Sequence, residues 1–349
     1  MWLLYGANGT TGRLVLRVWR AHFPDLPPPL LSGRRETELR ALAQAYGLSY
    51  QAFPLTALQN LKLPKEIRLI ANLAGPYRYT SGPWLKDCLQ QGRDYLDICG
   101  EWPVFAQLYA AAGEYAQKGL AVITGAGYDT VAGETALTLF RERYPQAQNL
   151  RLAIYAEGGF SAGTARAALG VLPAGEVYWK EGQLQPAPTQ TCQYRLPDGR
   201  LRTFRSAPLA ELITYPAWNP ELRTLRTYVG LPPKLQRWQG AIQWLSKQAL
   251  VQALIGWLLE QYRTTLANRM TLTARAYAIA DSVEAPVYVV LESPQPYWAT
   301  AWLVLRSLQL YLKEGAAAGV ASAFARWQKA LWEGLPTQIH WQPKTTPQG

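Results

Sequence analysis

The residues best placed to do chemistry stand near the start of the chain and read Gly6-Ala7-Asn8-Gly9-Thr10-Thr11-Gly12. An apolar segment, Trp2 to Tyr5, precedes this run, and apolar residues recur at helical spacing after it. Glycine lets a backbone turn approach a pyrophosphate, and the start of a helix offers free N–H groups and a positive dipole end. We therefore predict that residues 6–12 bind a dinucleotide. The alternative is a plain tight turn before a helix.

A second candidate segment ends the strand expected over Pro29 to Ser32 and reads Ser32-Gly33-Arg34-Arg35. Enzymes that take NAD usually carry an acidic residue here, which binds the ribose hydroxyls. Two guanidinium groups instead suit the 2′-phosphate of NADP. We predict NADP as the cofactor, with a solvated surface pair at a helix entry as the alternative.

Further small or polar residues follow the next expected strands. The run Asn72-Leu73-Ala74-Gly75-Pro76-Tyr77 follows one of them, and Cys99-Gly100 follows the strand expected near Tyr95. Ligands of open α/β sheets bind at the carboxyl ends of the strands. The residues expected to line the cofactor at these two ends are Ala74, Gly75, Pro76, Cys99 and Gly100.

The proton donor of any reaction must come from a restricted set of side chains. The two histidines, His22 and His340, stand in no metal-binding or catalytic motif, so we expect neither a metal site nor a histidine base. Tyr77 and the pair Tyr128–Asp129 follow strand ends and are the candidate proton donors, although each tyrosine could equally be a packing residue. A short-chain dehydrogenase requires Tyr-x-x-x-Lys, and no tyrosine has a lysine four residues on.

Composition excludes several classes of protein. Apolar residues make up 49% of the 349 residues, which excludes an intrinsically disordered chain. The 35 basic and 24 acidic residues give a net charge of +11, but the arginines are dispersed, so we expect no nucleic-acid partner. Three scattered cysteines, no secretory signal and no spanning apolar run lead us to expect a cytoplasmic protein.

The order of apolar segments predicts the architecture. In the first third, strands alternate with helices, which predicts an α/β domain with a doubly wound parallel sheet of Rossmann type. The second half contains a strand over Leu150 to Ala156. It also contains a hairpin, Cys192–Leu196 with Arg200–Phe204, joined by an Asp-Gly turn. We expect this half to be an α+β domain on a mostly antiparallel sheet.

Two regions of the second half leave alternatives open. The hairpin carries Arg195, Arg200, Arg202 and Arg205, which form either an anion-binding face or, as we favour, an edge strand guarded by charge. Residues 234–263 form an apolar segment rich in tryptophan. Such a segment is typical of a helix buried against a sheet or a dimer partner, and peripheral membrane contact is the alternative.

Five motifs together resemble a known family. In order they read GANGTTG, SGRR, NLAGPY, DYLDICGE and GAGYDTVAGE. This series resembles the saccharopine dehydrogenase-like oxidoreductases, most closely the branch with the trans-acting enoyl reductases. Residues 161–168 resemble a helix start of that branch, and Gly319 to Phe324 stand where the family has a closing helix. Residues 205–265 match only loosely, and Thr130 to Gly133 replace the family's usual proline or serine.

The resemblance implies a fold and a set of activities. It implies a Rossmann NADP-binding domain over 1–128 completed by helices in 298–335, an α+β substrate and dimerisation domain over 129–297, and a tail over 336–349. It also implies substrate contacts from Arg78, Gly163 and Thr164 and a homodimer. The function expected is NADP(H)-dependent reduction of a hydrophobic acyl or lipid-like substrate. The alternatives are a saccharopine-type amino-acid dehydrogenase, in which Arg78 binds a carboxylate, and a non-catalytic NADP-binding protein at a membrane.

Overall fold

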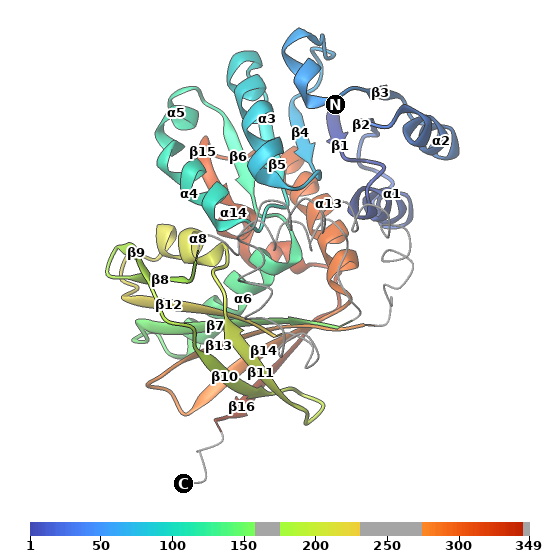
Figure 1. Ribbon diagram of the computed structural model, residues 1–349. Helices are drawn as coiled ribbons and strands as arrows, with labels where there is room; N and C mark the ends of the chain where they lie inside the picture. The colour runs from blue at the N-terminus through green and yellow to red at the C-terminus, as the bar shows by residue number, and fades with distance from the viewer. Residues whose placement is uncertain (158–174, 231–273, 345–349) are drawn as a thin grey trace, which may run out of the picture. The chain divides into compact units, whose positions relative to one another are not determined.

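The computed structural model describes residues 1–157, 175–230 and 274–344 (Figure 1). The chain divides into two compact units. One unit comprises Met1–Tyr128 and Tyr297–Leu331, and the other comprises Asp129–Pro296 and the chain from Trp332 onward. Each unit contains a sheet of its own.

The first unit contains a parallel sheet of seven strands, in the order β15-β6-β5-β4-β1-β2-β3. Most of its strands are short, buried apolar runs, as expected for a sheet covered on both faces. Their bounds are β1 Trp2–Tyr5, β2 Pro29–Gly33, β3 Tyr50–Ala52, β4 Leu69–Asn72, β5 Asp94–Asp97, β6 Ala121–Thr124 and β15 Gly319–Ser322.

Helices connect these parallel strands. They are α1 Thr10–His22, α2 Glu36–Tyr46, the 3₁₀ helix η1 Leu55–Asn60, α3 Tyr77–Gln91, α4 Trp102–Ala110 and α5 Ala112–Gln117. From β1 the chain adds strands in one direction through β3, and from β4 it adds them in the other. This order is that of a doubly wound Rossmann sheet, so the predicted fold class of this half is confirmed.

A C-terminal segment returns to the same sheet. It comprises α13 Pro296–Glu314, β15, α14 Ala323–Trp327 and the 3₁₀ helix η3 Gln328–Trp332. Strand β15 pairs in parallel with β6, and in Figure 1 it appears as a red strand beside a green one. The closing helix expected over Gly319–Phe324 is wrong for Gly319–Ser322, which are strand. Four residues are too few to reveal a period, and the open edge of β6 supplies hydrogen bonds that the sequence pattern does not contain.

The second unit contains a mixed, mostly antiparallel sheet, as predicted. Its main order is β10-β11-β12-β7-β13-β14-β16, with β8 beside β12 and β9 beside β8; β12 and β7 run parallel. The strand bounds are β7 Asn149–Ala156, β8 Val177–Lys180, β9 Gln183–Pro186, β10 Thr191–Arg195, β11 Leu201–Ser206, β12 Thr224–Gly230, β13 Ala276–Ser282, β14 Val287–Ser293 and β16 Gln338–Pro343.

Strand β16 corrects the expectation that residues 336–349 form a tail. Residues 338–343 pair antiparallel with β14 along the whole strand. The exposed Ile339 and the polar residues around it resemble a solvated terminus in composition. Pairing with a partner about 50 residues away in the chain is not visible in such a local pattern.

The interior of the second unit is rich in tyrosine. The rings of Tyr194 in β10 and Tyr288 in β14 lie 5.1 Å apart between centroids, although four strands separate β10 from β14 in the sheet order. The sheet must therefore curve so that the β10–β11 hairpin covers β13 and β14. Phe204, Tyr228 and Tyr277 belong to the same buried cluster.

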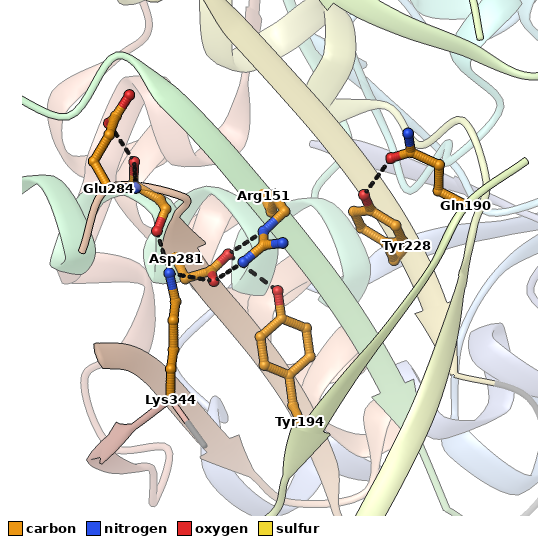
Figure 2. Close-up of polar contacts among 8 residues, drawn as sticks. Arg151, Gln190, Tyr194, Tyr228, Asp281, Glu284 and Lys344 are labelled. Atoms are coloured by element: carbon orange, nitrogen blue, oxygen red, sulfur yellow. Dashed lines mark hydrogen bonds and ion pairs between the residues drawn. The ribbon is translucent and has the colours of Figure 1, made fainter. Parts of the chain in front are cut away.

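A fully buried aspartate, Asp281, lies at one end of this cluster (Figure 2). Arg151 binds its carboxylate through two nitrogens, at 2.9 and 2.5 Å, and the hydroxyl of Tyr194 donates to Oδ1 at 3.0 Å. The Lys344 ammonium lies 3.1 Å from Oδ2. This network joins β7, β10 and β13 to the chain just beyond β16.

Helices α6 Tyr128–Arg143 and α8 Glu211–Trp218 contact each other in the second unit through polar residues. Trp218 donates its indole N–H to Glu134 at 3.3 Å. Glu134 and Glu211 are both buried, and burial raises the pKa of Glu211 well above its usual range, with the nearby charges of Glu134 and Asp129 adding to the effect.

The arginine-rich hairpin is an edge element with internal partners. Arg200 pairs with Asp198 and also with Glu157 at 2.5 Å, and Arg205 lies 3.8 Å from Glu176. These contacts give Arg200 and Arg205 acidic partners within the unit, which favours the interpretation as a charged edge strand over an anion-binding face. Among the described residues, no helix is long and apolar enough to cross a membrane.

Candidate functional site

The candidate site is the edge of the parallel sheet where the strands end. In the sheet order, β1 and β4 are neighbours, and the connections that leave them run in opposite directions. At such a switch point the loops separate and open a crevice for a ligand. The cofactor residues predicted from the sequence lie at the end of β2, in the loops after β1, β2, β4 and β5, and in the first turn of α1.

The glycine turn after β1 is packed so closely that side chains would not fit. Gly6 has a φ of +84°, and its N–H donates to the carbonyl of Ser32 at 2.9 Å. A Cβ on Gly12 would lie 2.4 Å from the carbonyl oxygen of Gly6 and 2.6 Å from that of Ala7. Helix α1 therefore starts directly against the turn, and the turn keeps this form because residue 12 is glycine.

The N-terminus of helix α1 has no side-chain cap. Gly9 is the N-cap residue and contributes no side-chain hydrogen bond, and the first turn carries no acidic residue. Thr10 and Thr11 are half-buried at this end. The N–H groups of a first helical turn, together with the dipole, favour an anion such as a phosphate.

The structure separates the two arginines that follow β2. Arg34 is exposed, and its positive charge opposes the burial that raises the pKa of Tyr5 to about 12, so the guanidinium lies near that ring. Arg35 forms an ion pair with Glu38, with 2.7 Å between Nε and Oε1. Arg34 is thus the guanidinium that stays available to an incoming phosphate.

Ser32 and Asn8, both predicted to contact the cofactor, use their side chains inside the protein. The Ser32 hydroxyl donates to the carbonyl of Gln51 at 2.9 Å, and the residue is fully buried. The Asn8 amide donates to Glu38 at 3.1 Å. Gly33 lies against Asn8, since a Cβ on Gly33 would be 2.8 Å from its Oδ1. The side chains of Ser32 and Asn8 therefore hold the glycine turn through contacts inside the protein.

A buried asparagine holds the loop after β4. Asn72 donates to the hydroxyl of Tyr95 at 2.9 Å, and its Oδ1 accepts the N–H of Ala74 at 3.1 Å. Thr80 donates to the carbonyl of Ala74 at 2.6 Å. The peptide between Gly75 and Pro76 is cis. Ala74 and Pro76 are half-buried and Gly75 is exposed, so this fixed loop presents small residues to solvent.

Two buried carboxylates, one at the end of β5 and one in the loop after it, bind the neighbouring loops. Asp97 Oδ1 accepts hydrogen bonds from Cys99 N at 3.1 Å, Thr124 Oγ1 at 2.8 Å and Gly125 N at 3.1 Å. Glu101 accepts the N–H of Tyr77 at 2.6 Å and that of Arg78 at 3.3 Å, and so caps helix α3. The loops after β4, β5 and β6 therefore form one connected edge.

Asp97 is an energetically costly member of this edge. The residue is fully buried, and its Oδ2 has no hydrogen-bond partner among the described residues. Burial raises the pKa of Asp97 to about 6, and the hydrogen bonds to Oδ1 oppose this shift only in part. A carboxyl group with such a pKa at the end of a strand is a common mark of a functional edge.

The structure gives different surroundings to the predicted catalytic residues. The Tyr77 hydroxyl donates to the carbonyl of Asn72 at 3.3 Å, and burial raises its pKa well above the usual range, which favours the packing alternative for this tyrosine. Tyr128 is buried, and its N–H donates to Thr300 at 3.0 Å. Asp129 is exposed, yet desolvation by the surrounding protein raises its pKa to about 6.

The remaining predicted residues divide into three cases. Cys99 is buried, and burial raises the pKa of its thiol, which favours a packing role for this side chain. Arg78 stands at the start of α3, 3.9 Å from Glu101 and stacked on Tyr79 at 4.6 Å. Gly163, Thr164 and the segment 234–263 lie outside the described residues. In the described part of the chain, no three His, Cys, Asp or Glu side chains could hold a metal ion.

Sequence reasoning missed Asn72, Asp97 and Glu101 as the residues that fix this edge. A signal was present for the first two, because each is a polar residue that ends a buried apolar strand. Glu38 gave no comparable signal, because its contacts with Asn8, Arg13 and Arg35 join three separate segments.

The turn, the uncapped helix start and the exposed arginine fit a phosphorylated dinucleotide. Gly6 and Gly12 have no side chains that would block the approach of a pyrophosphate to the backbone. The first turn of α1 contains no acidic residue. The sheet order and this edge are those of a Rossmann-type fold, whose ligands bind at the carboxyl ends of the strands.

Comparisons with known proteins give the relationship more closely. No family model matches the chain. Over 84 residues, 24% of this chain, it is 32% identical to a saccharopine dehydrogenase-like oxidoreductase of Mus musculus. Over 146 residues it is 28% identical to a protein of Mycobacterium tuberculosis named "Putative trans-acting enoyl reductase". The matches span only 19% and 34% of these two relatives.

A solved structure agrees over nearly the whole chain. The saccharopine dehydrogenase (L-Glu forming) of Saccharomyces cerevisiae superposes with a TM-score of 0.61, covering 97% of this chain and 99% of that one at 14% identity. The chain therefore has the fold of saccharopine dehydrogenase. Together with the curated relatives, this confirms the predicted resemblance to the saccharopine dehydrogenase-like oxidoreductases.

Proposed function

We propose that the chain is an NADP(H)-dependent oxidoreductase that reduces a hydrophobic acyl or lipid-like substrate. The observation that carries the cofactor part is the glycine turn at the switch point with Arg34 exposed beside it. The relatives support an oxidoreductase, and the mycobacterial relative supports an enoyl substrate. Peripheral membrane contact through 234–263 and a homodimer belong to the same proposal.

Each part of the edge has a task in this proposal. The turn and the start of α1 bind the pyrophosphate, and Arg34 binds the 2′-phosphate. The loop after β4, fixed by Asn72 and Glu101, orients the ring end of the cofactor through its backbone. When bound, the nicotinamide supplies the hydride. Asp129 is the proposed proton donor, because a pKa of about 6 lets its carboxyl group keep a proton in mildly acidic solution, where an ordinary aspartate has lost it.

A second candidate is a saccharopine-type amino-acid dehydrogenase. The specific observation in its favour is Arg78, whose guanidinium is partly exposed at the start of α3 and could bind a substrate carboxylate. Glu101 lies 3.9 Å from the Arg78 guanidinium and already provides a carboxylate there. This existing pair makes us favour the acyl substrate.

Binding measurements test the cofactor first. We expect NADPH to quench the tryptophan fluorescence of the wild type at lower concentration than NADH. Arg34→Ala should weaken NADPH binding about tenfold or more, on the scale of charge-assisted hydrogen bonds, and leave NADH binding unchanged. Gly12→Ala should weaken both by at least about tenfold, because the new Cβ displaces the turn. Gly113→Ala, whose Cβ would enter open space in α5, is the matched control.

A substrate panel then tests the reaction. NADPH oxidation with enoyl thioesters supports the acyl substrate, and its rate should fall as pH rises above about 6, because the Asp129 carboxyl loses its proton. Asp129→Asn should remove this pH dependence. Oxidation only with glutamate and an aldehyde would favour the second candidate. Tight NADPH binding without turnover, together with flotation on liposomes, would favour a non-catalytic protein at a membrane.

A further inference from the structure

Glu38 is the acidic residue at the edge where the predicted 2′-phosphate site lies. It stands in the first turn of α2, four residues after Arg34. Its Oε1 lies 2.7 Å from Arg35 Nε, and its Oε2 accepts from Asn8 at 3.1 Å and from Arg13 at 3.4 Å. One carboxylate thus joins the glycine turn, helix α1 and the residues that follow β2.

The arrangement changes the charge that a phosphate would meet. Arg13, Arg34 and Arg35 bring three positive charges to this edge, and Glu38 cancels one of them. The Glu38 side chain retains 27% of its exposure, so its charge acts on groups in the adjoining solvent as well as on its partners. A phosphate dianion at Arg34 would be repelled by this carboxylate and would compete with it for Arg35.

We propose that Glu38 is a specificity-determining residue that limits recognition of the 2′-phosphate. It holds Arg35 and Arg13 toward itself and leaves Arg34 as the principal phosphate ligand. The proposal rests on the proposed function, because it requires that the dinucleotide binds at this edge. It predicts that loss of the Glu38 charge increases the preference for NADP over NAD.

A second glutamate in the first turn of α2 provides a matched control for Glu38. Glu36, on the same first turn of α2, forms an ion pair with Arg40 at 2.6 Å and is well exposed. Arg40 also donates to the hydroxyl of Tyr50 at 3.1 Å, which lies in β3 and outside the glycine turn. Glu36→Gln removes the same charge from the same helix turn without touching the cluster around Glu38.

The experiment compares two small ligands by calorimetry. Adenosine 2′,5′-bisphosphate and 5′-AMP differ only by the 2′-phosphate, so the ratio of their dissociation constants isolates that group. We expect Glu38→Gln to bind the bisphosphate at least about fivefold more tightly and 5′-AMP within about twofold of the wild type. Glu36→Gln should change the ratio by less than about twofold. Thermal unfolding of each variant checks that the fold is kept.

A double variant shows whether the effect passes through the arginine. In an Arg35→Ala background, Glu38→Gln should improve bisphosphate binding by less than half of the factor seen with Arg35 present. An unchanged or weaker bisphosphate affinity in Glu38→Gln overturns the inference. So does a fall in 5′-AMP affinity, because Glu38 would then bind the ribose hydroxyls. If the wild type binds NADPH while Glu38→Gln shows no gain, only this inference fails; if it binds neither NADPH nor NADH, the proposed function fails.

Discussion

Two fully buried aspartates, one in each unit, are bound in opposite ways. Asp281 is bound by a guanidinium, an ammonium and a tyrosine hydroxyl, all from side chains (Figure 2). Asp97 is bound by two backbone N–H groups and a threonine hydroxyl, with no cation among these partners. Burial of a carboxylate is costly unless opposite charge is close. The charge of Asp281 is therefore neutralised by its partners, whereas Asp97 retains part of the free-energy cost of burying a carboxylate.

The difference follows from what each aspartate holds. Asp281 joins strands of a curved sheet, and side chains that reach across the interior serve this purpose. Asp97 joins the loops at the edge where we propose that the cofactor binds. Backbone N–H groups orient loops without adding a mobile charge. The costly carboxyl of Asp97 lies beside the cofactor edge predicted from the sequence. Burial also raises the pKa of Glu211 in the second unit, so a costly carboxyl does not by itself mark a site.

The largest expected effect comes from removal of the satisfied aspartate. Asp281→Ala leaves Arg151 and Lys344 without their shared partner in a partly buried place, and we expect a loss of about 3–5 kcal/mol in the free energy of unfolding. Urea denaturation followed by circular dichroism measures it. Asp198→Asn, on the exposed hairpin turn, is the control and should change little. A loss below about 1 kcal/mol would mean that the network does not stabilise the sheet.

The next effect concerns Asp97 and depends on pH. Its folded pKa of about 6 exceeds the unfolded value of 3.8, so the protonated form is favoured by folding. The contribution of Asp97 to the free energy of unfolding is complete below pH 3.8 and is lost as pH rises through 6. Relative to Asp97→Asn, which stays neutral, the wild type should lose up to about 3 kcal/mol between pH 4 and pH 7.5.

Urea denaturation at several pH values measures this difference. Asp25→Asn, at an exposed position between α1 and β2, is the matched control and should follow the wild type. A constant difference between wild type and Asp97→Asn across this range would contradict the raised pKa. It would also remove the contrast with Asp281 on which the comparison rests.

Local patterns predicted the part of the molecule that depends on local backbone. The turn at Gly6 to Gly12 and the strand over Pro29 to Ser32 were visible because glycine spacing and a short apolar run are properties of neighbouring residues. Pairing across long separations was not visible, so Gly319–Ser322 and 338–343 were missed as strands. No single motif encodes the hydrogen bond of the Tyr77 hydroxyl or the ion pair between Arg35 and Glu38, because both depend on side-chain contacts in the folded chain.

The smallest expected effect separates the two cations that bind Asp281. Lys344 lies 3.1 Å from the carboxylate, also donates to the carbonyl of Ser282, and is 24% exposed. In Lys344→Met, Arg151 and Tyr194 still bind Asp281, so we expect a loss of only about 1 kcal/mol by urea denaturation. Lys313→Met, whose exposed ammonium lies 3.7 Å from Glu314, should lose less than about 0.5 kcal/mol. A loss near that of Asp281→Ala would show that the lysine, rather than Arg151, neutralises the buried charge. The interior network would then depend on Lys344, the last described residue of the chain, instead of on Arg151 in β7.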